Sequence, residues 1–579
     1  LAASAAVVSA CAPAATPAPT VPPTEVPTEA PEATPVPEAT ATPAPPEAPP
    51  SKYNEAPMLA ELVRAGELPP VEERLPKEPL VLTQEWNEMP TDELDLEIGQ
   101  YGGMLRTVQP DPAWNPDLFI MNNEPPLRSP GLGIDDIRGN VFKAYEASED
   151  NRVFTFYLRE GLKWSDGTPV TTQDVLFAWE DVILSEKLTP VFPVWLRAGS
   201  KSDGEPLKLE VIDDFTFRLI SSEPYGRLPV QLALTGWRGY TDLLKPRHFL
   251  EQYHASYTPL EELEPLIEEA GLAEGEWWTL FQQKDVPNWH LCRAKAIGFP
   301  TLCPWMVVES TPTATIYRRN PYYFKVDAEG NQLPYIDELR SAVVADVEMS
   351  TMKLLAGEVD FLREDTALKD LPLYKENEEK GGYRVVLLLQ HVNPTTAWLN
   401  LTYEDEVWRQ VVRDLRFRRA LNLGIDYEEI IDAVYMGFGK PPTTVPGVYD
   451  PEKANQLLDE IGMDQRDGEG FRLGPDGNTF VIPFEVAMHA PDIVPVTELI
   501  LEYWNALGVK TTMKVIDAGL LGTRMAASEI QAMVIWDVEP MWRTGGWLDF
   551  RPSNQWAHPR HKRAHHAGHS CLAGGRSVV

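Results

Sequence analysis

The residues of this 579-residue chain that could do chemistry do not form a catalytic motif. The sequence has no H-E-x-x-H zinc motif, no G-x-S-x-G nucleophile elbow and no glycine-rich phosphate loop. Its 87 acidic residues supply carboxylate pairs by chance, so a glycosidase dyad does not follow from them. We therefore do not expect an enzyme, and a secreted glycosidase or peptidase stays only as an alternative.

Aromatic residues are the more informative group. The chain has 17 tryptophans and 19 tyrosines, whose faces could line a cleft and stack on sugar rings or peptide side chains. The formal net charge of −36 argues against nucleic acid and anionic lipid as partners. The sequence predicts no cofactor and no metal site.

The first fifty residues predict a targeting segment and a tether. Residues 1–10 are apolar or small and end at Cys11, which is typical of a signal peptide remnant followed by a lipidated cysteine. Residues 12–50 contain only Ala, Pro, Thr, Glu and Val, with 14 prolines, so they cannot bury enough surface to fold. We expect an extended polar tether that holds the protein at a membrane, outside the cytoplasm.

Such a compartment permits disulfides, which bears on the other cysteines. Cys292 and Cys303 either form a short-loop bridge or remain two buried thiols. Cys571 lies in a tail, 551–579, that has five basic and no acidic residues and five of the ten histidines. The tail is either a metal-binding segment or, as we prefer, an atypical end produced by a frameshift.

The elements that must position these residues predict a mixed α/β fold. Thr171 with Asp174 forms a capping box that opens a helix, and Asp450 before Pro451 opens another. Thr258 is predicted to cap a third helix. Residues 153–158 and 383–389 are rich in β-forming side chains and predict strands, the second buried on both faces.

Five segments in order resemble the oligopeptide/dipeptide/nickel-binding family of ABC solute receptors, solute-binding protein family 5. They are the signature at 144–182, Leu244–Leu250 (LKPRHFL), Tyr317–Tyr323 (YRRNPYY), Leu354–Asp360 (LLAGEVD) and Asp414–Asp426 (DLRFRRALNLGID). The resemblance covers about residues 95–540, and residues 55–80 are similar to an N-terminal extension in one branch of the family. It identifies the chain as a family member.

The resemblance implies a two-lobed α/β Venus-flytrap fold of the periplasmic-binding-protein type (type II, large cluster with an extra subdomain). The implied organisation is 1–10 signal peptide remnant, 11–50 lipidated Cys and tether, 51–94 N-terminal extension, 95–310 plus 513–550 first lobe with inserted subdomain, 311–512 second lobe and 551–579 atypical tail. A ligand would be enclosed between the lobes, and the closed form would be recognised by a permease.

The resemblance also implies a ligand and the residues that contact it. An oligopeptide is the first expectation and an oligosaccharide the alternative, because some members of that branch serve sugars. Asp537 lies near the place where peptide-binding members carry an acid for the peptide α-amine, although the surrounding sequence departs from their pattern. The implied ligand-binding residues are Trp398, Asn400, Trp536, Asp537, Trp542 and Trp547. The partners would be a membrane permease and its ATPase subunits, and the receptor would act as a monomer at the outer face of the cytoplasmic membrane or in the periplasm.

Overall fold

Helices and strands alternate along the chain, as the periodicity predicts. The structure is a computed structural model, and it describes residues 52–84, 96–110, 115–129, 136–233, 238–363, 365–387, 395–439, 441, 447–487, 492–536 and 572–573. Local signals are confirmed in several places: Thr171 and Asp174 make a capping box, and the Asp450 side chain accepts a hydrogen bond from the Lys453 amide. The chain turns out of the helix that ends at Ala506 through Gly508, whose φ is +83°.

Two four-stranded sheets, whose strands lie between Met104 and Val343, share one hydrophobic core. The antiparallel β5 sheet has the order β5 (Phe142–Ala147), β6 (Val153–Leu158), β8 (Thr216–Ile220), β7 (Lys208–Asp213). The β2 sheet has the order β2 (Met104–Gln109), β12 (Glu338–Val343), β10 (Ala314–Arg319), β9 (Trp305–Ser310). Along β6, Phe154, Phe156 and Leu158 are buried and the residues between them are half-buried, the alternation expected of a strand with one face on a core. This core therefore holds both sheets together.

Short helices cover this region. They are α3 (Pro116–Asn122), α4 (Thr172–Phe177), α5 (Leu228–Ala233), α6 (Arg247–Leu250), α7 (Leu260–Glu269) and α8 (Trp277–Lys284). Helix α7 begins after Pro259 without any side-chain cap, so the predicted cap by Thr258 is wrong. The Thr258 hydroxyl instead donates to the carbonyl of Glu251.

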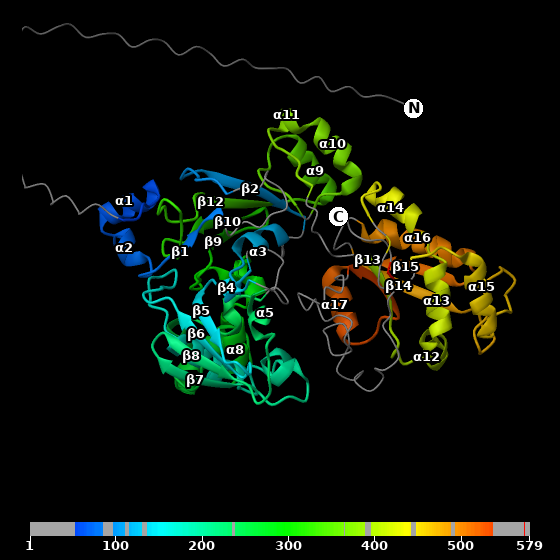
Figure 1. Cartoon of the computed structure of the whole chain (residues 1–579), viewed down its shortest axis with the longest axis horizontal. Coiled ribbons are helices and arrows are strands. Elements are labelled where there is room, and N and C mark those ends of the chain that lie inside the picture. The colour runs from blue at the N-terminus through cyan, green and yellow to red at the C-terminus, as the bar shows by residue number, and fades with distance from the viewer. Residues whose placement is uncertain are drawn as a thin grey trace, which may run out of the picture. The chain divides into compact units, whose positions relative to one another are not determined.

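The second half of the chain forms a sheet with helices on both faces (Figure 1). The β13 sheet has the order β15 (Lys510–Val515), β14 (Val481–Val486), β16 (Ala532–Trp536), β13 (Thr395–Leu399), β17 (Leu572–Ala573). Its helices are α12 (Glu406–Arg413), α13 (Leu415–Leu423), α14 (Tyr427–Tyr435), α15 (Pro451–Glu460), α16 (Ile493–Ala506) and α17 (Ala518–Ala526). Ala532 and Val534 of β16 join the core with α12–α16, whereas Met533 and Ile535 face α17, as strand alternation requires.

Strand pairing corrects the predicted lobe boundaries. β10 and β12 follow residue 311, yet they pair with β9 and β2. β15 and β16 extend past residue 513, yet they pair with β14 and β13. The assignment of 311–343 to the second lobe and of 513–536 to the first is therefore wrong, because backbone pairing between strands distant in sequence leaves no local signal.

Residues 347–385 lie in the sequence between the strands of the β2 sheet and the first strand of the β13 sheet, and they form a small core of their own. Helices α9 (Val347–Leu355), α10 (Leu371–Glu376) and α11 (Glu378–Gly381) surround a cluster that includes Val108 of β2 and Tyr374. Asp360 of the LLAGEVD motif receives two hydrogen bonds from the Arg106 guanidinium of β2, at 2.7 and 2.9 Å. Residues 383–387 form no strand, so the strand predicted over 383–389 is wrong in its described part; the Tyr383 hydroxyl donates to the carbonyl of Tyr374 instead.

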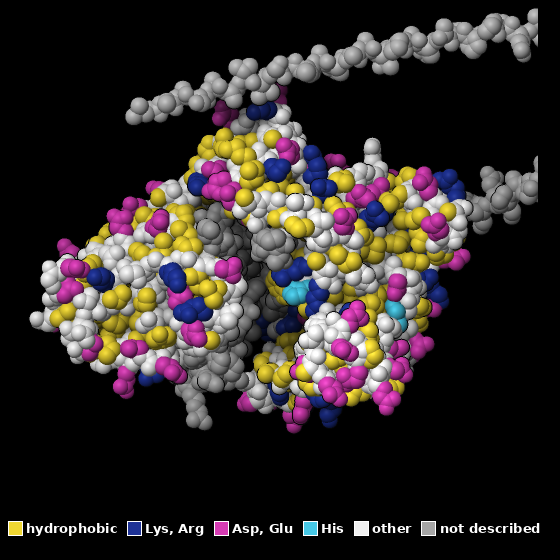
Figure 2. All heavy atoms as spheres, turned by 180° about the vertical axis from the view of Figure 1, so that it is seen from behind, with side chains coloured by type: hydrophobic (Ala, Val, Ile, Leu, Met, Phe, Trp, Pro, Cys, Tyr) yellow, Lys and Arg dark blue, Asp and Glu magenta, His cyan; other side chains and the backbone are white. Residues whose placement is uncertain are grey.

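The surface is acidic without one dominant patch on the face in Figure 2, where Asp and Glu side chains alternate with basic and apolar ones. Two short pairings complete the topology, β1 (Leu80–Leu82) with β11 (Lys325–Asp327) and β3 (Leu127–Arg128) with β4 (Arg138–Gly139). In the part of the chain that the structure describes, no helix is both long and apolar enough to cross a membrane.

Candidate functional site

The carboxyl ends of parallel strands are the usual ligand-binding edge of an open α/β sheet. In the β13 sheet this edge lies at the ends of β14 and β16, since those strands run parallel. β13 runs antiparallel to β16, and its first residue, Thr395, pairs with the last residue of β16, Trp536. The edge therefore gathers Thr395, Val486 and Trp536 from strands far apart in sequence.

One polar cluster is built at this edge. Asp492, half-buried before α16, accepts hydrogen bonds at a single carboxylate oxygen from the Thr395 hydroxyl and, at 2.6 Å, from the Tyr435 hydroxyl. Asp492 does not cap its own helix with its side chain. Burial and the neighbouring carboxylate raise the pKa of Tyr435 well above its usual value, so this phenol stays protonated and remains a donor. Sequence reasoning missed Asp492, whose only local signal is its place just before a helix.

Trp398 is the predicted ligand residue that the structure places on the α17 face. It is half-buried and packs in a cluster with Met533, Ile535 and Leu521, while its neighbours Ala397 and Leu399 face the opposite core. Its indole Nε1 is buried and has no hydrogen-bond partner among the described residues. An unpaired buried N–H is a costly feature, which keeps Trp398 a candidate for a polar contact with a ligand.

Asn400 has a different role. Its amide nitrogen donates to the Ser528 hydroxyl at 3.1 Å and to the Ile530 carbonyl at 2.9 Å. Its amide oxygen accepts from both the backbone and the hydroxyl of Thr402. Because all its side-chain groups are paired within the chain, Asn400 fixes the end of β13 and presents no spare group to a ligand.

The other predicted contact residues lie at or beyond the end of β16. Trp536 is the last residue of that strand, and only its backbone is described. Asp537, Trp542, Trp547 and Cys11, the predicted site of lipidation, lie outside the described residues. Their roles stay predictions.

The two central cysteines are free and buried, so the bridged alternative is not formed. Burial raises the pKa of both Cys292 and Cys303 to about 12, which leaves them as inert thiols. Their backbones are used instead: the Tyr317 hydroxyl donates to the Cys292 carbonyl at 2.6 Å, and the Asn320 amide donates to the Cys303 carbonyl at 3.0 Å.

The β2 sheet closes its own parallel edge with buried polar side chains. The Asn115 amide donates to Ser341 Oγ at 2.8 Å, and Ser341 donates to Gln109 Oε1 at 2.5 Å. Asn115 also caps α3 by accepting from the Leu118 amide. These residues link the ends of β2 and β12 to the start of α3; polar residues inside otherwise apolar strands were the signal that could have revealed them.

A second buried polar group lies after α3. Glu124 receives two hydrogen bonds from Lys325 Nζ, at 2.8 and 2.9 Å, one from the Tyr323 hydroxyl and one from the Asn140 amide. Burial lowers the pKa of Lys325 to about 8, although Glu124 opposes this. Burial raises the pKa of Glu124, but Lys325 and the hydrogen bonds outweigh it and leave a net lowering, so the pair is ionised at neutral pH.

The described residues lack the side-chain groupings that bind metal ions. Among the described residues, no three His, Cys, Asp or Glu side chains come together in a way that could hold an ion. The expectation that the protein uses no metal or cofactor stays a prediction.

The fold is that of an α/β protein with two sheet-based cores, and comparison with known proteins gives its family. Residues 136–555 match the model of the bacterial extracellular solute-binding proteins, family 5 Middle. The chain belongs to this family, and the predicted two-lobed periplasmic-binding-protein fold class is confirmed.

Named relatives differ in what they bind. The chain is similar to the periplasmic alpha-galactoside-binding protein of Rhizobium meliloti (strain 1021), with 28% identity over 469 residues, which is 74% of this chain and 62% of that protein. Among solved structures it is similar to the oligopeptide-binding protein OppA, with 32% identity, a TM-score of 0.53 and coverage of 85% of this chain and 76% of that one. The periplasmic binding protein MelB from Agrobacterium fabrum C58, solved with stachyose, shares the fold at 23% identity with a TM-score of 0.65, over 85% of this chain and 74% of that one.

Proposed function

We propose that this protein is the extracytoplasmic solute receptor of an ABC importer. The observation that carries the proposal is membership of the family over residues 136–555, together with two separate sheet-based cores of the kind that two lobes require. In this mechanism a solute binds between the lobes and stabilises the closed form in proportion to its preference for that form. A membrane permease with its ATPase subunits then receives the solute from the closed receptor.

The proposed solute is an oligopeptide. The similarity to OppA supports this choice, and Asp537 would pair with the peptide α-amine through a charge-assisted hydrogen bond. Trp398, Trp536, Trp542 and Trp547 would supply aromatic faces around the ligand. An oligosaccharide is the second candidate, which the 28% identity to an alpha-galactoside-binding protein favours. Aromatic faces suit sugar rings and peptide side chains equally well, so Asp537 is the residue that distinguishes an oligopeptide from an oligosaccharide as the solute.

The remaining features fit the same role. Cys11 is proposed to carry the lipid anchor, and residues 12–50 to be the tether. The protein is proposed to act as a monomer and to release its ligand unchanged, which separates it from a secreted glycosidase or peptidase. In this proposal the solute drives closure because it binds the closed form more tightly than the open form.

Native mass spectrometry on freshly purified protein that begins at residue 51 tests this proposal. A retained mass in amino-acid increments supports the peptide receptor, and one in hexose increments supports the sugar receptor. Calorimetric titration with a peptide library and with raffinose-type oligosaccharides follows, using Asp537→Asn as a variant that should weaken peptide binding about tenfold or more and leave sugar binding unchanged. Absence of binding to both classes would refute the receptor proposal, and cleaved product in the mixture would indicate an enzyme.

A further inference from the structure

The segment 52–82, which we call the N-terminal strap, packs against the part of the protein that contains the β5 and β2 sheets. We call that part the first region of the fold. It contains α1 (Pro57–Ala65), α2 (Val71–Arg74) and strand β1. β1 pairs in parallel with β11, and the Leu80 amide donates to the Phe324 carbonyl at 3.1 Å. Leu80 itself joins the large core shared by the β5 and β2 sheets.

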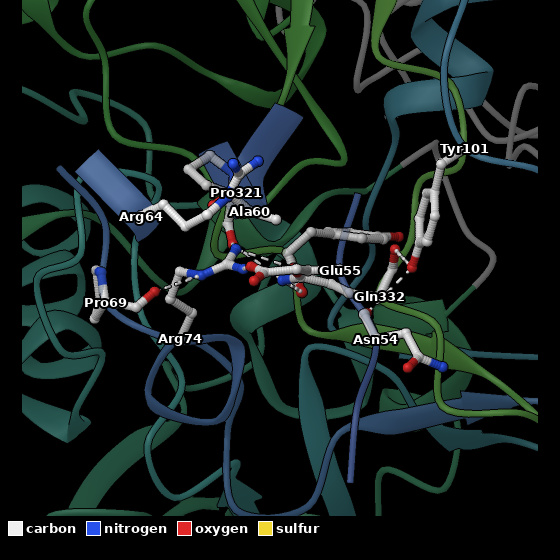
Figure 3. Close-up of polar contacts among 10 residues, drawn as sticks. Asn54, Glu55, Ala60, Arg64, Pro69, Arg74, Tyr101, Pro321 and Gln332 are labelled. Atoms are coloured by element: carbon white, nitrogen blue, oxygen red, sulfur yellow. Dashed lines mark hydrogen bonds and ion pairs between the residues drawn. The ribbon is translucent and has the colours of Figure 1, made fainter. Parts of the chain in front are cut away.

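Arg74 is the central contact of the strap. Its side chain is 0% exposed, and Figure 3 shows it pointing between strap residues and residues of the main fold. Within the strap it bonds to Glu55 and to the Pro69 carbonyl. Toward the main fold it donates to the Pro321 carbonyl and to Gln332 Oε1. Burial lowers the pKa of Arg74 and Glu55 partly restores it, so the buried cation depends on these partners.

Further backbone contacts close the strap over the fold. Arg159 donates to the Glu78 carbonyl at 3.0 Å, and the Lys77 amide donates to the Glu160 carbonyl at 2.9 Å. Near the other end, the Asn54 amide donates to the Gly330 carbonyl and the Tyr101 hydroxyl donates to the Asn54 carbonyl. The strap is therefore held along its length.

The strand that the strap covers carries one half of the buried ion pair. Leu80 of β1 lies opposite Lys325 in the register of β11, and Lys325 bonds to Glu124. Glu124 follows α3 by two residues, and α3 starts at the carboxyl end of β2, where Asn115 joins it to Ser341. A continuous path of contacts thus runs from the strap through a desolvated ion pair to α3.

We propose that the strap is a latch for the first region of the fold. When it is docked, it keeps water from the Lys325–Glu124 pair and holds α3 in place at the end of β2. When it is released, Lys325 becomes hydrated, Glu124 loses its fixed partner and α3 loosens. The inference about α3 stands without a ligand; its effect on affinity rests on the proposed function.

Hydrogen–deuterium exchange on the full chain tests the latch. Arg74→Met keeps an apolar stem and removes the guanidinium, so we expect exchange to rise about tenfold in peptides covering 52–84 and also in 116–129. Peptides covering α16, in the other large core, should not change. The matched control is Arg64→Met on α1, because Arg64 is exposed and, among the residues that the structure describes, its side chain bonds only within α1, to the Ala60 carbonyl and to Glu61. It should leave every peptide unchanged.

Each other pattern overturns the latch. Faster exchange in the strap with an unchanged α3 means that the strap only covers the surface, and no change in either means that Arg74 does not hold it. If Arg74→Met loses protection everywhere, Glu55→Gln replaces it: a smaller rise confined to the strap and α3 supports the latch, and any other pattern refutes it. With a solute in hand, Arg74→Met should raise the dissociation constant about tenfold and Arg64→Met should not. A wild-type protein that binds no solute bears on the proposed function alone, since the exchange measurement uses no ligand.

Discussion

Replacing Lys325 by methionine should destabilise the protein strongly, because the change leaves a carboxylate buried without its cation. The side chains of Lys325 and Glu124 are 2% and 5% exposed, and both oxygens of Glu124 lie within 2.9 Å of Lys325 Nζ. Breaking one half of such a pair costs about 3–5 kcal/mol, mostly from the uncompensated charge. Methionine fills nearly the same volume, so a cavity contributes little.

The double variant Glu124→Gln/Lys325→Met separates the charge from the packing. Glutamine keeps an oxygen that can accept from Tyr323 but carries no charge, so we expect the double variant to lie within about 2 kcal/mol of wild type. The single variant should also recover part of its stability in mild acid, since the unpaired Glu124 can then take up a proton.

Urea unfolding followed by tryptophan fluorescence measures these differences, because 17 tryptophans report on the chain. A loss below about 1 kcal/mol in Lys325→Met, or a double variant as unstable as the sum of the two single variants, would refute the argument that the pair is desolvated and interdependent.

Three further predictions follow from other parts of the structure. Burial raises the pKa of Asp174 to about 6, above its ordinary 3.8, so the folded state holds this proton more tightly than the unfolded state does. The free energy of unfolding should therefore fall by about 3 kcal/mol as the pH rises from about 4 to about 6. Asp174→Asn should flatten that part of the profile in pH-dependent urea unfolding, and an unchanged profile contradicts the prediction. Asn400→Ala should cost about 1–3 kcal/mol of stability and leave solute affinity within about twofold, whereas a tenfold loss in a binding titration would make Asn400 a ligand contact. Cys292 and Cys303 should resist alkylation in the native protein and react after unfolding, as mapped by peptide mass spectrometry; a disulfide between them in purified protein would contradict the buried free thiols.

Several elements could be predicted from sequence because their causes are local. The Thr171–Asp174 capping box and the helix that begins after Asp450 depend on side chains within a few residues of one another. β6 matches its predicted range, 153–158, since its alternating aromatic residues specify both strand and buried face. The aligned motifs were sufficient to identify the family, which the match over residues 136–555 confirms.

The incorrect predictions have non-local causes. Residues 383–387 have the composition of a strand, but a strand needs a neighbour to pair with, and Tyr383 packs against α9–α11 instead. The lobe boundaries failed for the same reason, since β12 finds its partner in β2, more than two hundred residues earlier. The cysteine spacing left both a bridge and two buried thiols open, and the structure has the two buried thiols.

What the sequence by itself determined is therefore the class of fold, the family and several of the helices and strands, because caps, periodicity and ordered motifs lie within short stretches of chain. Only the tertiary structure decided which residues meet: Asp492 with Thr395 and Tyr435, Lys325 with Glu124, and Arg74 with Gln332. Each of these contacts joins residues that are distant in sequence, and each gains its strength from burial. Burial depends on the whole packed molecule, so no local pattern encodes it.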